Sequence, residues 1–266
     1  MTYPIRFLCF GIIFLLACNS PKKPEAIIVL PPPIEVAPIK GKPVLILDAG
    51  HGGPDPGALN DSLNLSEKSV TRKLVDAIYK KIDTSKISVI LTRTKDENVD
   101  RHVRVANAEK YNPDLFLSIH NNFDKDTLVN GFEINISDSI ITNIYAFDTV
   151  RISNPFKDSC IKYASIFEKN LASNFPKMLP RSKKLRKDNI WVLCFPKYPS
   201  ILVEFGFISN RNDAFYLTDK NEIDKFATAT ANSIYKIFGL EPTVTPKKAP
   251  QLKQPKPTTK KPSKKK

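Results

Sequence analysis

The chain has 266 residues, of which 41% are apolar, and a formal net charge of +14. This length is enough for one α/β domain with a packed core or for two small domains. Nine lysines and no acidic residue lie between Pro242 and Lys266, so the rest of the chain carries only +5 and the composition excludes a uniformly basic protein.

The N-terminus has the features of an export signal. Arg6 precedes an apolar run from Phe7 to Ala17, which is too short to span a membrane as a helix. The run ends in "LLAC", which resembles the lipobox of bacterial lipoproteins and implies lipidation of Cys18. A secretory signal cleaved near Ala17, or an uncleaved anchor, is the alternative. We expect a lipoprotein held at a membrane surface and facing the periplasm or cell envelope, where nucleic acid is a poor candidate for a partner.

Composition divides the rest of the chain into three parts. Residues 19–42 are rich in proline and predict an extended tether after the signal peptide of residues 1–18. Residues 241–266 are a low-complexity Pro/Lys segment that predicts a disordered tail, suited to an anionic surface or serving solubility alone. Residues 43–240 alternate between apolar runs and amphipathic stretches and predict one domain.

Within residues 43–240 the alternating elements predict a layered α/β sheet with strands buried on both faces. Strands are expected at residues 43–50, 87–93, 114–122, 131–137, 189–195 and 200–207. Helices are expected at residues 66–83, 100–111, 161–175 and 221–238. Ser66 is the expected N-cap of the first helix.

Two polar side chains lie at or just after the ends of predicted strands, where ligands bind in open α/β sheets, and a third lies within another strand. His51 follows the first strand in a glycine-rich turn, and His120 lies at the end of a second strand. Either histidine alone is more often structural than a metal ligand. Together they suit a metal, with Glu67 as a third ligand and a fourth position for water, as in catalytic zinc sites. Glu204 lies in an apolar run, where an unpaired charge is costly, and is the expected proton carrier.

The chain also resembles a known family, the zinc-dependent N-acetylmuramoyl-L-alanine amidases of amidase type 3. The matching segments are "ILDAGHGGPDPGA", the glutamate and lysine of "SEKSVTRKL", "LTRTKDENVDRHVRVANAEK", "DLFLSIHNN", "GFEI" and "SILVEFGFISNRNDAFYL". The resemblance implies Zn²⁺ held by His51, Glu67 and His120, with Glu204 as the catalytic acid and base. It implies hydrolysis of the amide that joins N-acetylmuramic acid to L-alanine in peptidoglycan, on a twisted, mostly parallel or mixed sheet with helices on both faces.

Several features stay open at this level. Asn121 stands where the family usually has alanine, and Asn121 and Glu133 are candidate substrate-binding residues. The stretch from Ser137 to Cys160 is longer than in the simplest members, and we hypothesise a cover over the site that an activator protein removes; an inert surface loop is the alternative.

Two other functions remain, a wall-binding lipoprotein without catalysis and a zinc peptidase of the stem peptide. "GHGG" lacks the lysine and spacing of a phosphate-binding loop, which argues against a nucleotide site.

The last histidine and the two internal cysteines are not expected to take part in the chemistry. His102 lies among charged residues and is expected to be a solvated helix residue. Cys160 and Cys194 do not form a metal-ligand pattern and are expected to be structural or free.

Overall fold

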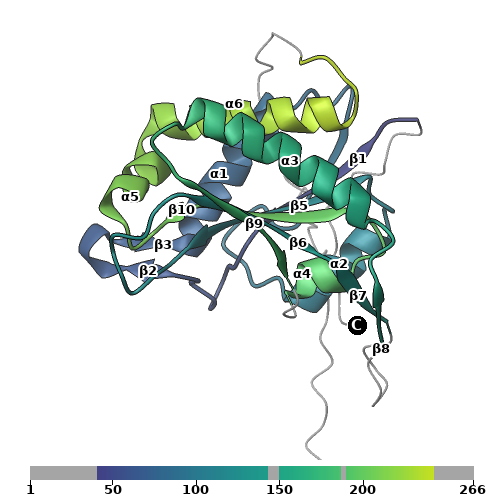
Figure 1. Ribbon diagram of the computed structural model, residues 1–266, viewed down its shortest axis with the longest axis horizontal. Coiled ribbons are helices and arrows are strands. Elements are labelled where there is room, and N and C mark those ends of the chain that lie inside the picture. The colour runs from purple at the N-terminus through teal and green to yellow at the C-terminus, as the bar shows by residue number, and fades with distance from the viewer. Residues whose placement is uncertain (1–40, 143–149, 187–189, 243–266) are drawn as a thin grey trace, which may run out of the picture. The chain divides into compact units, whose positions relative to one another are not determined.

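A computed structural model of the chain describes residues 41–142, 150–186 and 190–242. Its centre is a six-stranded sheet with the strand order β4-β1-β5-β10-β6-β9 (Figure 1). The strands are β1 (Val44–Ala49), β4 (Ser88–Leu91), β5 (Leu115–Asn122), β6 (Phe132–Ser137), β9 (Pro180–Arg186) and β10 (Ser200–Phe207). β4, β1, β5 and β10 run parallel, whereas β6 runs antiparallel to β10 and carries β9 with it. The predicted mostly parallel sheet of about six strands is confirmed.

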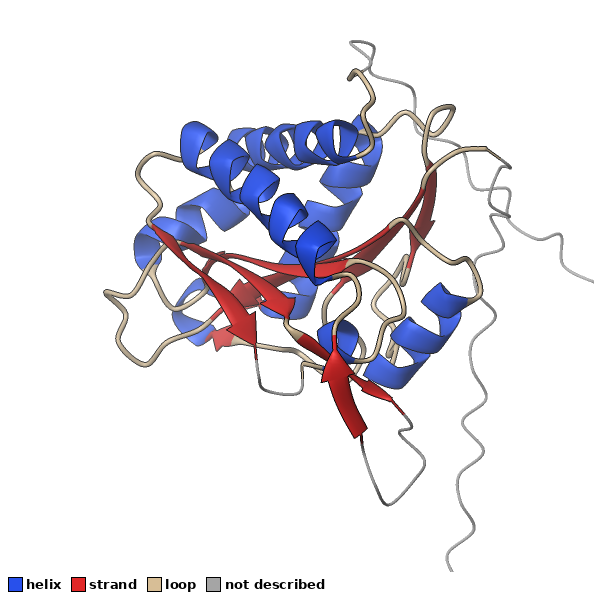
Figure 2. Ribbon diagram, turned by 45° about the vertical axis from the view of Figure 1, so that its right-hand side comes forward, coloured by secondary structure: helices blue, strands red, loops and turns tan. Residues whose placement is uncertain are grey.

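Helices cover both faces of this sheet (Figure 2). One face carries α1 (Glu67–Lys81), α3 (Lys157–Asn174) and α6 (Lys220–Ile237), and the other carries α2 (Arg101–Glu109) and α4 (Trp191–Cys194). α5 (Arg211–Thr218) follows β10. Successive side chains of a strand point to opposite faces, so Leu45 and Leu47 enter the core under α1 while Val44 and Ile46 pack toward α2 and α4. This two-sided burial explains why the strands are nearly continuous apolar runs.

The parallel direction of four strands brings the polar residues of the site to one edge of the sheet. The four parallel strands all end at the same edge, which therefore collects His51 after β1, His120 near the end of β5 and Glu204 on β10. In the register of β10 with β5, Glu204 lies beside His120. The predicted convergence of strand ends is thus a direct consequence of the parallel topology.

Most expected elements occur within a few residues of their predicted bounds, but residues 189–195 do not form a strand. The described part of this segment forms the single turn of α4, and its buried Val192, Leu193 and Cys194 pack against α2, β6 and β10. Trp191 and Phe195 stack with ring centroids 3.8 Å apart, a contact that four-residue helical spacing allows. A short apolar run does not distinguish a strand from a buried helical turn.

Two small hairpins complete the described structure. β2 (Leu59–Asn60) and β3 (Leu65–Ser66) flank the 3₁₀ turn η1 (Asp61–Leu63), and Ser66 is the N-cap residue of α1, although its side chain makes no capping hydrogen bond. β7 (Ser139–Thr142) and β8 (Val150–Ser153) form the second hairpin.

The structure describes residues 137–142 and 150–160 of the stretch that was hypothesised to cover the site. Those residues form β7, β8 and the start of α3, and β7 packs beside α4. No residue of β7 or β8 lines the cleft described below, as far as the described chain extends. The middle of the stretch, residues 143–149, lies outside the described residues.

Cys160 and Cys194 are buried thiols rather than a disulfide. Among the described residues, no helix is long and apolar enough to cross a membrane. Cys18 and nearly all of the tether and of the Lys-rich tail lie outside the described residues, so the predictions made for them stay predictions.

Candidate active site

The turn after β1 presents His51 in a conformation that few side chains adopt. His51 has φ of 60°, in the left-handed region, and is followed by Gly52 at 132° and Gly53 at 60°. Gly52 and Asp55 close the turn with a β-bridge, and Gly50 N–H donates to the Ile119 carbonyl of β5 at 3.1 Å. The glycines therefore let the chain reverse immediately after a buried strand, which leaves the imidazole at the sheet edge.

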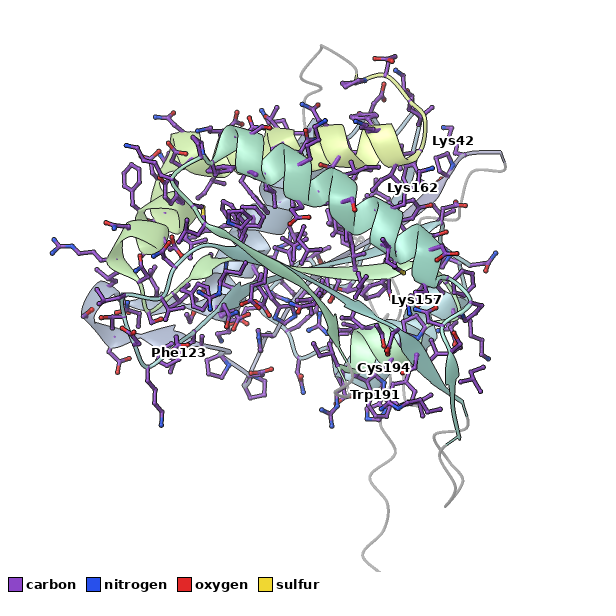
Figure 3. All side chains as sticks on the ribbon, in the orientation of Figure 1. Lys42, Phe123, Lys157, Lys162, Trp191 and Cys194 are labelled. Atoms are coloured by element: carbon purple, nitrogen blue, oxygen red, sulfur yellow. The ribbon has the colours of Figure 1, made fainter. Side chains whose placement is uncertain are left out.

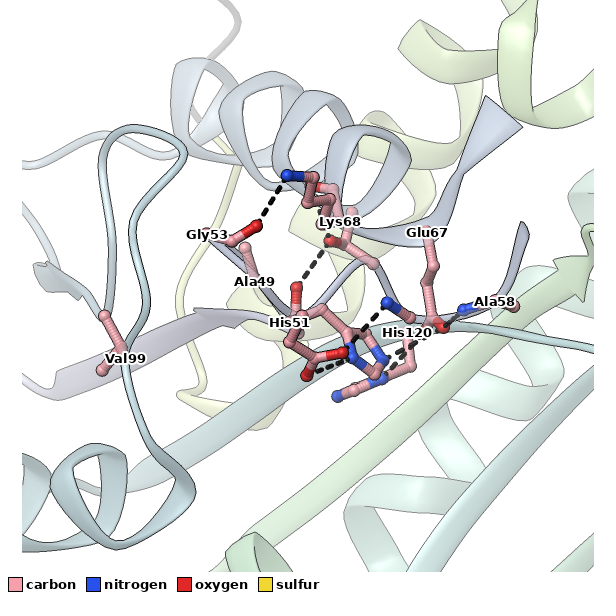
Figure 4. A network of polar contacts seen from close by, with 12 residues as sticks. Ala49, His51, Gly53, Ala58, Glu67, Lys68, Val99 and His120 are labelled. Carbon is pink, nitrogen blue, oxygen red and sulfur yellow. Dashed lines mark hydrogen bonds and ion pairs between the residues drawn. The ribbon is translucent and has the colours of Figure 1, made fainter. Parts of the chain in front are cut away.

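Lysine and aspartate side chains hold this turn from outside. Lys68 Nζ donates to the Gly53 carbonyl at 2.7 Å and pairs with Asp96 at 2.8 Å (Figure 4). Asp96 in turn accepts a hydrogen bond from Gly53 N–H at 2.7 Å. Both backbone groups of Gly53 are thus fixed, so the loop that carries His51 is anchored to α1.

The three predicted ligands converge at this edge. Glu67 is the first residue of α1, His120 lies on β5, and one ligand atom from each of His51, Glu67 and His120 lies within 4.8 Å of the other two. His51 Nε2 is 3.0 Å from Glu67 Oε2, and His120 Nδ1 is 2.9 Å from Glu67 Oε1. Figure 4 shows the two rings next to each other beside the Glu67 carboxylate.

The electrostatics of the three groups are those of a cation site. Burial lowers the pKa of His51, but Glu67 and Asp55 outweigh this effect and raise the pKa to about 9. Burial likewise lowers the pKa of His120, and Glu67 again reverses the shift and raises it. Burial raises the pKa of Glu67, yet the two histidines hold it well below its usual range. A buried carboxylate that raises the proton affinity of two neighbouring imidazoles also favours a bound dication.

The donor set fits Zn²⁺, and the distances of 3.0 Å and 2.9 Å from Glu67 to the two histidines are close to those that a bound Zn²⁺ requires. Imidazole nitrogens and carboxylate oxygens are zinc ligands, and bonds of about 2 Å to a tetrahedral ion place the ligand atoms roughly 3.3 Å apart. Outer contacts orient two of the ligands: His51 Nδ1 contacts Asp55 Oδ2 at 2.8 Å, and Glu67 accepts hydrogen bonds from Ala58 N–H at 2.9 Å and Asn121 N–H at 3.0 Å. Sequence reasoning missed the role of Asp55, although a carboxylate four residues after a candidate ligand in the same loop was a usable signal.

Glu204 completes the site on the neighbouring strand. Its side chain is half-buried, and its Oε2 is buried without a hydrogen-bond partner in the described structure. Burial, together with the negative charges of Glu67 and Glu133, raises the pKa of Glu204 to about 7, although His120 acts in the opposite direction. A carboxyl group with such a pKa can both accept and donate a proton near neutral pH.

The two candidate substrate-binding residues, Asn121 and Glu133, lie in different places. Asn121 lines the cleft, but its side chain is buried and donates to the Phe205 carbonyl, so its predicted contact with substrate stays a prediction. Glu133 lies opposite Glu204 in the register of β6 with β10 and contacts Arg181 Nε at 3.1 Å. It is not among the residues that line the cleft, and its visible effect is on the charge of Glu204.

A cleft of about 720 Å³ runs across these groups. It contains the three ligands and Glu204, and its walls come from the β5 end, the start of α2 and α4. Phe123 and Trp191 line it and lie on the side of the sheet away from α3 and α6 (Figure 3). His102 is exposed, as expected, but its ring also contacts Trp191 at a centroid distance of 3.8 Å, which the sequence did not indicate.

Gly50 offers a test of how tightly the ligands are packed. A Cβ at this position would lie 2.3 Å from His120 Cε1 and 2.4 Å from Nε2. We expect Gly50→Ala to displace the His120 ring and to weaken Zn²⁺ binding at least about tenfold, measured by isothermal titration calorimetry. Gly239→Ala is the control: its Cβ would meet nothing within 4 Å, and the backbone strain from its φ of 65° arises outside the cleft, so Zn²⁺ binding should be unchanged. Unchanged Zn²⁺ affinity in a folded Gly50→Ala variant would contradict this assignment of His120.

Comparison with known proteins decides the family. A family model described as N-acetylmuramoyl-L-alanine amidase matches residues 45–236, which run from β1 into the last turn of α6. The chain belongs to this family. The amidase is 31% identical over 202 residues to a sporulation-specific N-acetylmuramoyl-L-alanine amidase of Bacillus subtilis, covering 75% of this chain and 69% of that protein. It is 30% identical over 192 residues to the N-acetylmuramoyl-L-alanine amidase LytC of the same organism, covering 72% of this chain but only 34% of LytC.

Solved structures agree with the amidase fold. The N-acetylmuramoyl-L-alanine amidase AmiC2 of Nostoc punctiforme superposes with a TM-score of 0.61 at 27% identity, covering 74% of this chain and 97% of that one. The CwlD amidase of Clostridioides difficile, solved in complex with the GerS lipoprotein, gives a TM-score of 0.62 at 27% identity, covering 74% and 99%. The core of this amidase is therefore the family's catalytic fold, with His51, Glu67, His120 and Glu204 gathered at one edge of its sheet.

Proposed function

We propose that this amidase hydrolyses, with Zn²⁺, the amide bond between N-acetylmuramic acid and L-alanine in peptidoglycan and so releases stem peptides. The observation that carries the proposal is the group of His51, Glu67 and His120, with ligand atoms within 4.8 Å of one another and Glu204 on the next strand. The relatives named as N-acetylmuramoyl-L-alanine amidases support the choice of bond.

The residues of the site divide the chemistry among them. His51, Glu67 and His120 would hold Zn²⁺, which, when bound, polarises a carbonyl and acidifies a water molecule. Asp55 fixes the orientation of the His51 ring, and the Asn121 backbone N–H fixes the Glu67 carboxylate. Glu204 accepts the proton of the attacking water and donates it to the amine of L-alanine as the C–N bond breaks. The pKa of about 7 suits Glu204 to both steps.

We further propose that lipidation of Cys18 holds the amidase at a membrane surface that faces the cell envelope. The lipobox-like "LLAC" and the proline-rich residues 19–42 support this placement, because an anchored tether would bring the domain to peptidoglycan. Cleavage there would serve cell-wall remodelling or cell separation. An activator protein is a further proposal, and the CwlD–GerS complex supplies a precedent for a lipoprotein partner within the family.

Digestion of purified peptidoglycan sacculi tests the reaction. The full-length chain loaded with Zn²⁺ should release intact stem peptides with a free L-alanine amino terminus, identified by mass spectrometry. Shorter peptides or single amino acids would indicate a peptidase instead, and binding to sacculi without any soluble product would indicate a wall-binding protein.

Metal content supplies the matched control for that digestion. His51→Ala and His120→Ala should each lose Zn²⁺ and product together, since each removes one of three ligands. His102→Ala, the remaining histidine of the chain, should keep its Zn²⁺.

A further inference from the structure

One wall of the cleft is an aromatic stack that carries an arginine. The guanidinium carbon of Arg101 lies 5.3 Å from the centroid of the Trp191 ring. Trp191 is itself packed against Phe195 and His102, with both ring centroids 3.8 Å away. Arg101 and His102 begin α2, and Trp191 begins α4, so two helices that pack together supply the stack. Cation–π contact restricts a long side chain that would otherwise sample many rotamers.

Arg101 is available to a ligand. It is exposed and lines the cleft, and within the described part of the chain no carboxylate forms an ion pair with it. The other cations near the site are occupied. Arg104 is buried against Asp48, and Lys68 is bonded to Asp96 and the Gly53 carbonyl. A guanidinium presents a planar set of donors that matches a carboxylate in bidentate fashion.

The charges along the cleft give it a direction. Arg101 attracts a carboxylate at the wall, whereas at the centre of the site Glu67 and Glu204 offset the charge of a bound Zn²⁺. A substrate with a neutral part and an anionic part would therefore bind preferentially with its anionic part toward α2 and α4.

We propose that Arg101, held against Trp191, binds a carboxylate of the peptide stem and thereby places the peptide side of the scissile bond toward α2 and α4. The inference rests on the proposed function, since that substrate joins an uncharged sugar to a peptide that carries carboxylates. In a stem whose third residue is lysine, the form used in the test below, the nearest of these is the α-carboxylate of the glutamate that follows L-alanine, and the other is the carboxylate at the end of the stem.

Three matched substrates test the proposal: a muramyl peptide with both carboxylates free, one with the glutamate α-carboxylate amidated, and one with the terminal carboxylate amidated. With the free acid, Arg101→Gln in the full-length, Zn²⁺-loaded chain should raise KM about tenfold and leave kcat nearly unchanged, because the contact is made equally in the ground and transition states. Amidation of the contacted carboxylate should cost the wild type about the same factor and abolish the effect of Arg101→Gln. Trp191→Leu should raise KM less than Arg101→Gln does, and Arg211→Gln, an exposed arginine on α5, is the control.

Direct binding separates this proposal from the proposed function. The dissociation constant of each muramyl peptide is measured in the Glu204→Gln background, with and without Arg101→Gln. The proposal is supported, even where the wild type shows no hydrolysis, if Arg101→Gln raises the dissociation constant about tenfold only for peptides in which one particular carboxylate is free. An equal effect of Arg101→Gln on all three substrates, or no effect on any, overturns it.

Discussion

Glu204→Gln is expected to lower kcat/KM for peptidoglycan amide hydrolysis about a thousandfold while Zn²⁺ remains bound. The amide of glutamine keeps the size of the side chain but can neither accept the proton of water nor return it to the leaving amine. Glu204 is not one of the three ligands, so the metal content should stay at that of the wild type. Loss of Zn²⁺ together with activity would contradict the assigned role.

The pH profile identifies the titrating group behind this effect. Burial raises the pKa of Glu204 to about 7, and a base must be ionised to act, so kcat/KM should fall as pH drops below the pKa. A bound dication favours the carboxylate, which places the midpoint in the Zn²⁺-loaded enzyme below that value. Glu133→Gln supplies the comparison, because removal of a like charge opposite Glu204 should move the midpoint to still lower pH. If the low-pH midpoint of kcat/KM is the same in Glu133→Gln as in the wild type, the titrating group is not Glu204.

The central elements and the site were predictable from the sequence because their signals are local and agree with one another. β1 and β5 are apolar runs with polar residues at or after their ends, β10 is an apolar run that contains Glu204, and parallel topology requires the ends of the three strands to meet. The glycines around His51 marked a turn with close contacts, and both Gly50 and Gly57 prove to lack room for a Cβ beside the ligands. Agreement between pattern and topology is what allowed residues 51, 67, 120 and 204 to be grouped.

The elements that were missed have no such local signal. β9 is a strongly basic segment without apolar alternation, and it is a strand because β6 offers it a free edge. α4 is formed by an apolar run that is equally compatible with a strand. The stacking of Trp191 on Phe195 and the packing of α4 on α2 favour the helical turn. Tertiary contacts decided both cases.

Charge pairing across the sequence was missed for the same reason. Asp48 lies in the core near the end of β1 and Arg104 lies on α2, 56 residues later, yet the two form a buried ion pair. Arg104 also donates to the His51 carbonyl at 2.8 Å, and Asp48 accepts from Ser118 at 2.6 Å. The pair therefore joins α2 to the turn that positions His51, and nothing in either segment alone names its partner.

Removing one member of this pair should have the largest effect on stability. Arg104→Met leaves the Asp48 carboxylate buried without its countercharge, and we expect a loss of about 3–5 kcal/mol in the free energy of unfolding at pH 7. Urea denaturation in the presence of a metal chelator measures this loss without a contribution from bound metal.

The pH dependence of that loss distinguishes charge from packing. Burial raises the pKa of Asp48, but Arg104, Ser118 and Thr92 outweigh it and lower the pKa in the wild type. The wild type thus holds stability that is present above the ordinary aspartate pKa and is lost as pH falls through the lowered one. In Arg104→Met the pKa of Asp48 should instead lie above its unfolded value, so the variant loses stability as pH rises. The difference between the two proteins in the free energy of unfolding should accordingly shrink from pH 7 to pH 4. Asp48→Asn added to Arg104→Met should restore part of the lost stability at pH 7. A gap of the same size at both pH values would show that lost packing, rather than the uncompensated charge, destabilises the variant.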